Sequence, residues 1–293
     1  MTKEPRTKEF KSGLKVAYFE NLTDILDWCE SEVGNTQWSG DSERTDNAYV
    51  NWSGTSSLKD AIKIGREGWS EGAKKIKKNI DGFHVVGLKT TPAPHYEVSG
   101  DSVDVGRFLS GEPENMLNWE EVEEDGHKVV DIYYNCAVSG RYDADCITRY
   151  GSAVVSVIDY LESTGRRCNL YAYWSMIEMS RKATKRAYVI QIKRSEEALN
   201  IASCAFCLGH PSFVRRILFK TMQSMPEFRL LGYGMPQEFK ELTEEAKESV
   251  VFQTINNAGY SFKKDSHISE YVKNKLPEVL NSLEVSEKTK FDF

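Results

Sequence analysis

The side chains best suited to chemistry follow a predicted strand at residues 129–135, VVDIYYN. Asn135 ends that strand, Ser139 lies in the next turn, and Asp143 and Asp145 begin a helical pattern. Proteins with an α/β fold usually bind their ligands in a loop of this kind, between a strand and a helix. The sequence therefore predicts a partner-binding or ligand-binding loop at residues 135–145.

Two interpretations of the acidic residues in this loop are open. Oxygen ligands from Ser139, Asp143 and Asp145 suit a hard divalent cation such as Mg²⁺. Carboxylates at a helix start more often cap the helix and oppose its dipole. We favour capping, and therefore expect no bound metal and no cofactor.

Two adjacent cations, Arg215 and Arg216, lie in a locally basic part of the chain. They could form a phosphate-binding or partner-binding surface, and we include them among the partner-binding candidates. A solvated helix face with one arginine paired to an acid is the favoured interpretation, because no interleaved aromatic residues or nucleic-acid motif accompany the pair. Nucleic acid is therefore a less favoured partner than protein.

A Cys-x-x-Cys sequence, Cys204 to Cys207, is followed three residues later by His210. A zinc site would need a fourth ligand at comparable spacing, and no second cysteine pair occurs. The residues around this sequence are small and apolar with helical spacing, which indicates packing in the core.

Catalytic motifs find little support in the sequence. The five histidines are spread out, and there is no Gly-x-Ser-x-Gly, His-Glu-x-x-His or glycine-rich phosphate loop. Two glycine-containing stretches, GREGWSEG and GRFLSGEPENM, are either functional loops or tight turns, and the sequence leaves both interpretations open. A non-enzymatic role is the favoured expectation.

The composition indicates a globular protein of the cytoplasm. The chain has 293 residues, of which 40% are hydrophobic, so it can bury a proper core. Its net charge of -6 argues against a sequence-independent nucleic-acid coat. No run of about 18 apolar residues occurs, and the charged N-terminus lacks the apolar core of a signal peptide, so no membrane association is expected.

Strands and helices alternate from about residue 129 onward. A helix predicted at residues 143–165 is followed by strands at 166–177 and 185–195. We therefore expect an α/β fold with a mostly parallel sheet and helices on both faces, at residues 119–293. A smaller α+β region is expected at residues 1–118, including a helix that starts near Ser57.

Three predictions concern less regular segments. Residues 228–234, FRLLGYG, are expected to form a short strand, and residues 243–259 a helix that ends before Gly259. A closing helix is expected to be interrupted at Pro277. Residues 81–91 are expected to form a strand.

The order of strand, polar loop, long helix, second strand and hairpin strand resembles the von Willebrand factor A domain. That domain opens with a loop of the form Asp-x-Ser-x-Ser, which binds a divalent cation. Asn135-x-Ala137-x-Ser139 falls where the motif belongs, but only Ser139 keeps its type. The resemblance implies this architecture with a degenerate metal site; an ordinary turn in another α/β fold, such as a Rossmann-like one, is the alternative.

Several longer stretches resemble an uncharacterised family of phage-encoded proteins. They are WSGTSSLKDAIKIGREGWSEG, VDVGRFLSGEPENM, RYGSAVVSVIDYLESTGRRCNLY and LGHPSFVRRILF. The resemblance implies a bacteriophage or mobile-element origin and action in the host cytoplasm. It supplies no catalytic residues.

These observations favour an interaction or scaffold protein that binds a protein partner through the loops at the carboxyl end of the sheet. The competing hypothesis is a factor of phage nucleic-acid metabolism. It would use Asp131, Asp143 and Asp145 with Mg²⁺, and Arg215 and Arg216 on phosphate. A virion component is a third possibility.

Overall fold

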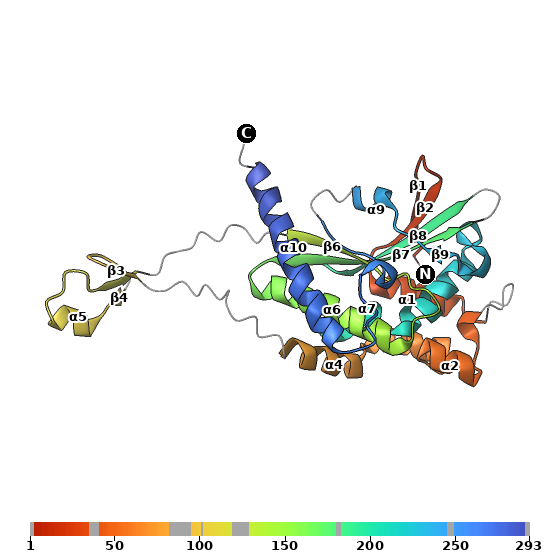
Figure 1. Ribbon diagram of the computed structural model, residues 1–293, viewed down its shortest axis with the longest axis horizontal. Helices are drawn as coiled ribbons and strands as arrows, with labels where there is room; N and C mark the ends of the chain where they lie inside the picture. The colour runs from red at the N-terminus through yellow and green to blue at the C-terminus, as the bar shows by residue number, and fades with distance from the viewer. Residues whose placement is uncertain are drawn as a thin grey trace.

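The computed structural model describes residues 3–34, 41–81, 95–100, 102–118, 129–179, 183–244 and 249–290. Its centre is a seven-stranded mixed sheet in the order β1-β2-β8-β7-β6-β10, with β9 paired beside β7 (Figure 1). The strands are β1 (Arg6–Glu9), β2 (Leu14–Phe19), β6 (Val129–Asn135), β7 (Arg167–Glu178), β8 (Thr184–Lys193), β9 (Met235–Pro236) and β10 (Val250–Phe252).

The strand that precedes the predicted loop, β6, has a parallel neighbour on each side. β6 pairs in parallel with β7 on one side and with β10 on the other. β8 is antiparallel to β7 and parallel to β2, and β1 closes that edge as a hairpin with β2. The expected α/β fold with parallel strands around β6 is confirmed.

Most described helices cover one face of this sheet, and Figure 1 shows α1, α6 and α7 below it with α9 above. The main helices are α1 (Leu22–Ser31), α2 (Asn47–Ser53), α3 (Leu58–Glu67), α4 (Ser70–Asp81), α6 (Ala144–Ser163), α7 (Ile201–Gly209), α8 (Phe219–Ser224) and α10 (Ser266–Lys290). A π-helical segment, η3 (Phe213–Leu218), leads into α8. On the opposite face, Leu242 of α9 (Lys240–Glu244) packs over Leu14 and Val16 of β2.

The alternation of strand residues explains the two faces. Ile132 and Tyr134 of β6 point into the main core with α6 and α7, and the Tyr134 hydroxyl donates to Leu208 O at 2.9 Å. Tyr133, between them, faces the other side and stacks on Tyr171 at 4.8 Å between ring centroids. Successive side chains of a strand point to opposite faces, so one helical layer buries only every second residue.

The α6 helix begins and ends as its sequence predicts. Asp143 is the N-cap, and Gly165, with φ of 86°, follows the end in the left-handed region that favours glycine. The helix packs against α4, α7 and α10. Among the described residues, no helix is long and apolar enough to cross a membrane.

The predicted boundary at residue 118 does not follow the sheet. β1 and β2 precede that boundary, yet β2 pairs with β8 over six residue pairs, from Leu14↔Lys185 to Phe19↔Ile190. α1 and α3 belong to the same core as β6 and α6. The apolar residues of β2 complete a sheet that the C-terminal half begins.

Residues 95–118 contain a small second sheet. Its order is β3 (His95–Glu97), β5 (Met116–Asn118) and β4 (Ser102–Val103), with the short helix α5 (Val105–Leu109) between β4 and β5. The residues that join this unit to the main sheet lie outside those described.

Several local predictions were wrong. Residues 250–252 form strand β10 where a helix was predicted, and residues 228–234 contain 3₁₀ turns, η4 (Pro226–Phe228) and η5 (Leu231–Tyr233), where a strand was predicted. α10 continues through Pro277. The helix from Ser57 is confirmed, since the Ser57 hydroxyl accepts from Asp60 N at 3.1 Å. Most of the strand predicted at residues 81–91 lies outside the described residues.

Candidate functional site

The carboxyl ends of β6 and β10 lie side by side, because the two strands pair in parallel. The chain leaves β6 through α6 to reach β7 on one side, whereas β10 lies on the other side of β6. Open α/β sheets bind ligands outside the carboxyl ends of strands at such a reversal of strand order. The candidate site is therefore built from residues that follow β6 and β10.

A polar cluster centred on the Glu238 carboxylate joins these strand ends. Glu238 Oε2 accepts from Asn135 Nδ2 at 2.9 Å and from the Tyr173 hydroxyl at 2.8 Å. Its Oε1 accepts from the backbone N–H of Thr254 at 2.7 Å. Asn135 Nδ2 also donates to Ser175 Oγ at 2.9 Å. Hydrogen bonds to a carboxylate are stronger than neutral ones, so Glu238 fixes the segments after β6 and β10 relative to β7.

The Tyr173 hydroxyl is a donor in this cluster and stays protonated. Burial raises its pKa above the ordinary range, and the nearby Glu238 carboxylate raises the pKa further. Sequence reasoning missed Glu238, which lies 103 positions after Asn135 in a segment without periodic pattern. Only the fold brings the two residues together.

Asn135 shapes the loop from within. Its side chain is 1% exposed, and Oδ1 accepts from the backbone N–H of Ala137 at 3.0 Å, which turns the chain just after β6. The prediction that Asn135 contacts a partner directly is therefore wrong for this conformation, because its amide is enclosed and fully engaged.

The outer part of the loop is accessible. Ser139 is half-buried, and its carbonyl accepts from Tyr142 N at 3.1 Å, so residues 139–142 form a turn. Asp143 and Asp145 are exposed. Asp143 Oδ1 accepts from Cys146 N at 2.7 Å, and this bond lowers the pKa of Asp143. The predicted capping role of Asp143 is confirmed.

Arg215 is buried and holds this turn in place. Its side chain donates from Nη2 to Tyr142 O and from Nη1 to Trp52 O, both at 2.6 Å, and its guanidinium lies 4.2 Å from the Trp52 ring. Burial lowers its pKa to about 10. The Trp52 indole in turn donates to Gly140 O at 3.2 Å. The turn is therefore clamped to α2 from two sides.

Arg216 is buried beside it and binds a different segment. Its Nη1 donates to Ser42 O and Arg44 O at 2.9 Å, and its Nη2 and Nε donate to Thr55 O at 2.7 Å and Thr55 Oγ1 at 3.0 Å. Neither arginine lies on a solvated helix face or on a partner-binding surface, so both interpretations from sequence were wrong. Residues 211–220 are buried on every side.

The carboxylates of the competing hypothesis do not converge. Asp131 lies within β6 and accepts from Asn169 Nδ2 at 2.8 Å, four residues and roughly 13 Å before the end of the strand. Asp143 is occupied as a helix cap. Within the described part of the chain, no group of three or more His, Cys, Asp or Glu side chains could hold a metal ion.

Cys204, Cys207 and His210 lie in the core, as their surroundings predicted. Both cysteines are buried and free, and burial raises the pKa of Cys204 to about 12. His210 Nδ1 accepts from Ser212 N at 3.1 Å, and its ring meets the edge of Trp69 at 4.6 Å. These contacts belong to packing between α7 and the following segment.

We expect His210 to make stability depend on pH. Burial lowers its pKa to about 4, whereas the unfolded chain has a pKa of about 6.5. As the pH falls from about 6.5 to about 4, the unfolded state takes up the proton first, so up to about 2–3 kcal/mol of stability is lost in this window. Urea unfolding at several pH values gives the free energy of unfolding as a function of pH. Between about pH 6.5 and pH 4, this free energy should fall less steeply for His210→Asn than for the wild type. Equal slopes would contradict a buried neutral imidazole.

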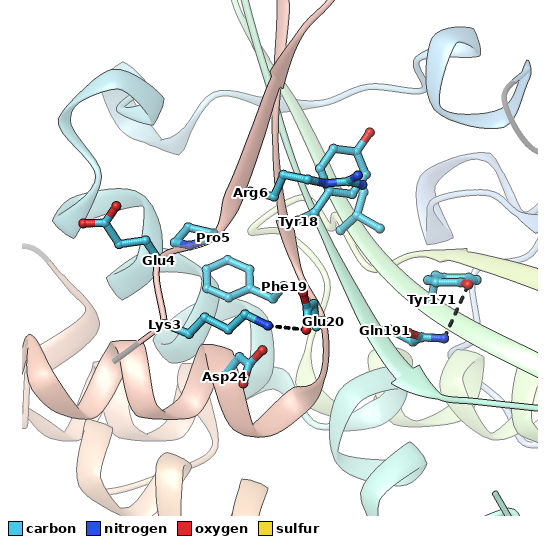
Figure 2. Close-up of a pocket in the computed structure, with 11 residues that line it drawn as sticks. Lys3, Glu4, Pro5, Arg6, Tyr18, Phe19, Glu20, Asp24, Tyr171 and Gln191 are labelled. Carbon is cyan, nitrogen blue, oxygen red and sulfur yellow. Dashed lines mark hydrogen bonds and ion pairs between the residues drawn. The ribbon is translucent and has the colours of Figure 1, made fainter. Parts of the chain in front are cut away.

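Two pockets lie near the open face and edge of the sheet. One, of about 440 Å³, lies between residues 3–6, the end of β2 and the middle of β7 and β8 (Figure 2). In it Lys3 pairs with Glu20, and Arg6 lies 4.8 Å from the Tyr18 ring, so its own walls engage these cations. The other, of about 380 Å³, borders the carboxyl end of β10.

The second pocket and the Glu238 cluster share neighbouring residues of the chain. It is lined by Gln253, next to Thr254 of the Glu238 cluster, and by Asn257, Tyr260 and Asn274. Carboxamides both donate and accept hydrogen bonds, as a peptide main chain requires. No predicted site residue lines either pocket, but only the second of these two is next to the Glu238 cluster, so we place the candidate site at the carboxyl end of β6 and β10.

Comparison with protein families gives one match. The family model described as "Domain of unknown function (DUF7192)" matches residues 7–284. The chain belongs to this family. Because the match crosses residue 118 without a break, the family unit includes β1 and β2 as well as the C-terminal half, in agreement with the sheet. No curated protein and no solved structure matches the chain.

Proposed function

We propose that this chain is an interaction protein with a von Willebrand factor A-like sheet, and that it binds a protein partner through the loops at the carboxyl end of β6 and β10. The observation that carries the proposal is the clamped turn. The buried Arg215 side chain donates hydrogen bonds to Tyr142 O and Trp52 O and so fixes the turn. Arg141, Asp143 and Asp145 are exposed around that turn. A preorganised charged surface loses little conformational entropy on binding.

The strand order supports the architectural part of the proposal. Strands β8-β7-β6-β10 follow the expected sequence of first strand, helix, second strand and antiparallel third strand, with a further parallel strand beside the first. β8 differs from an edge hairpin strand because β2 continues the sheet beyond it.

The partner chemistry follows from the loop and the neighbouring pocket. The exposed loop carries charges of both signs, and the pocket beside β10 is lined by carboxamides and tyrosines. Protein surfaces, with mixed charges and peptide groups, match this combination better than the uniform negative charge of nucleic acid. The resemblance to phage-encoded proteins would place this partner in a bacterial host.

Reversing the loop charges is expected to weaken partner capture. In the variant Arg141→Glu/Asp145→Lys, like charges would face each other across the interface, which should weaken binding by about tenfold or more. The measurement is affinity capture from an extract of the host, followed by titration of the recovered protein. The matched control is Glu270→Lys/Lys273→Glu, an exposed charge reversal on α10.

The control variant should bind as the wild type does. If the loop variant retains wild-type affinity, the partner does not bind this loop and the proposal fails. If DNA or RNA is recovered in place of protein, the nucleic-acid hypothesis takes its place.

A further inference from the structure

Exposed apolar side chains gather in the small unit of residues 95–118, defined here as the arm. Among the described residues, nine large hydrophobic side chains are exposed, and five of them belong to the arm. The five are Val98, Val103, Val105, Phe108 and Leu109. Such a concentration on one short segment marks an interaction surface, because scattered exposed residues are the norm elsewhere.

The arm is held together by polar contacts, while its apolar groups face outward. Asp104 caps α5 by accepting from Gly106 N at 2.9 Å, and it accepts from the Tyr96 hydroxyl at 3.0 Å. Arg107 lies 3.9 Å from the Tyr96 ring and pairs with Glu112 at 2.6 Å. No residue of α5 is buried. A unit this small cannot form a sufficient core, so covering its apolar face would stabilise it.

The apolar residues of α5 form one face. Val105, Phe108 and Leu109 have the i, i+3, i+4 spacing that places side chains together on a helix. Phe108 is 60% exposed and Leu109 is 78% exposed. This face is the centre of the surface that needs a partner.

A second apolar surface lies on the main sheet, near the end of β7. It consists of Met179, Leu231 and Met235, and we call it the Leu231 surface. Leu231 is 80% exposed, and its backbone N–H donates to Glu178 Oε2 at 2.8 Å. Met235 in β9 pairs with Ile177 in β7.

The turn that presents Leu231 is strained. Gly232, Tyr233 and Gly234 all have positive φ, of 60°, 65° and 70°, and Tyr233 lacks the freedom of glycine. The Tyr233 ring stacks on Phe219 at 3.7 Å between centroids, which holds the turn. Strained backbone of this kind is concentrated at functional sites.

The two surfaces carry opposite charge. The described residues of the arm include four acids and one arginine, a net charge of -3: Glu97, Asp104, Arg107, Glu112 and Glu114. Among the described residues that adjoin the Leu231 surface on β7 and β8, Lys185 and Arg186 are basic and Glu178 is acidic, a net charge of +1. Complementary charge steers two surfaces together and fixes their orientation.

We propose that the arm of one chain docks on the Leu231 surface of a second copy of the same chain. In the described part of the chain, the two surfaces together account for eight of the nine exposed large hydrophobic residues, the ninth being Val129. Because an apolar, acidic surface meets a different apolar surface bordered by basic residues, the contact is head-to-tail, and it extends into a ring or a chain of copies. This inference is independent of the partner proposed for the 135–145 loop.

Sedimentation velocity of the full chain tests the association. The weight-average mass of the wild type should rise over about a hundredfold range of concentration, and should fall at high salt because exposed charges are screened. Phe108→Asp and Leu231→Asp should each weaken association by about tenfold or more. Val129→Asp, the matched control outside both surfaces, should associate as the wild type does.

Mixing the two variants tests the head-to-tail geometry. The Leu231→Asp chain keeps an intact arm and the Phe108→Asp chain keeps an intact Leu231 surface, so an equimolar mixture should form a dimer and nothing larger. A wild type that stays monomeric at every concentration overturns the proposal, whether the arm docks on its own chain or on another protein. A mixture that stays monomeric overturns it as well.

Discussion

Replacing Arg216 by alanine is expected to lower the free energy of unfolding by about 3–5 kcal/mol. The side chain is 0% exposed, and its four hydrogen bonds satisfy Ser42 O, Arg44 O, Thr55 O and Thr55 Oγ1. Removing the guanidinium takes its hydrogen bonds from all four acceptors, of which Thr55 O retains a longer bond from the Ser53 hydroxyl at 3.3 Å, and it opens a cavity. Both effects act in the folded state only.

The matched control is Arg44→Ala. Arg44 is exposed and pairs with Asp46 at 2.8 Å, so its loss should cost no more than about 1 kcal/mol. Arg216→Lys should fall between the two, because an ammonium has three donors and lacks the planar fork of a guanidinium. Urea unfolding followed by circular dichroism measures all three. A loss below about 1 kcal/mol for Arg216→Ala would show that water replaces the guanidinium, contrary to a tightly packed site.

The sequence was sufficient for the elements whose signals are local. The strands β6, β7 and β8 were predicted from their own apolar residues. Helix α6 was predicted from its apolar periodicity and from Asp143 and Gly165 at its two ends. β10 was mistaken for a helix, because a strand of three residues at a sheet edge, two of them buried, has too short a pattern to distinguish the two structures.

The sequence was insufficient where a side chain forms hydrogen bonds with residues that are distant in the chain. Arg216 looked solvated because its acceptors lie more than 160 positions earlier, at residues 42–55. Glu238 was missed for the same reason. A charged side chain is expected to be exposed only if the folded chain offers it no buried hydrogen-bond acceptors. The sequence around Arg216 does not show that residues 42–55 supply such acceptors.

The buried arginine pair also explains why the N-terminal region is part of the candidate site. Arg216 fixes residues 42–55, and within them Trp52 is clamped by Arg215 and donates to Gly140 O. Residues on both sides of position 118 therefore determine where the 139–142 turn lies. A fragment that starts after residue 118 would lack half of this clamp.

Substitution of Gly151 is expected to destabilise the protein although it lies inside a helix. A Cβ atom at this position would lie 2.5 Å from Leu208 O and 2.7 Å from Gly209 Cα, both on the backbone of α7. Alanine normally stabilises a helix by about 1 kcal/mol relative to glycine. Here we expect Gly151→Ala to cost about 2–3 kcal/mol and Gly151→Val about 4 kcal/mol or more, because α7 must move away.

The control on the same helix is Ser156→Ala, which adds no atom toward α7. The Ser156 hydroxyl donates to Ser152 O within α6, so its loss should change stability by less than about 1 kcal/mol. Denaturant unfolding measures the series. A neutral or stabilising Gly151→Ala would mean that α6 and α7 are not in close contact at this point.

The same substitution should also weaken binding at the 135–145 loop. α7 leads through His210 into the segment that carries Arg215, and the Thr148 hydroxyl donates to Gly209 O at 3.1 Å across the same contact. Moving α7 outward displaces Arg215 from Tyr142 O, so the turn loses its clamp while its exposed residues are unchanged. Weaker partner capture by folded Gly151→Ala, with Ser156→Ala unaffected, would connect the packing of two helices to recognition at the loop. Unchanged capture would show that the turn keeps its conformation without Arg215.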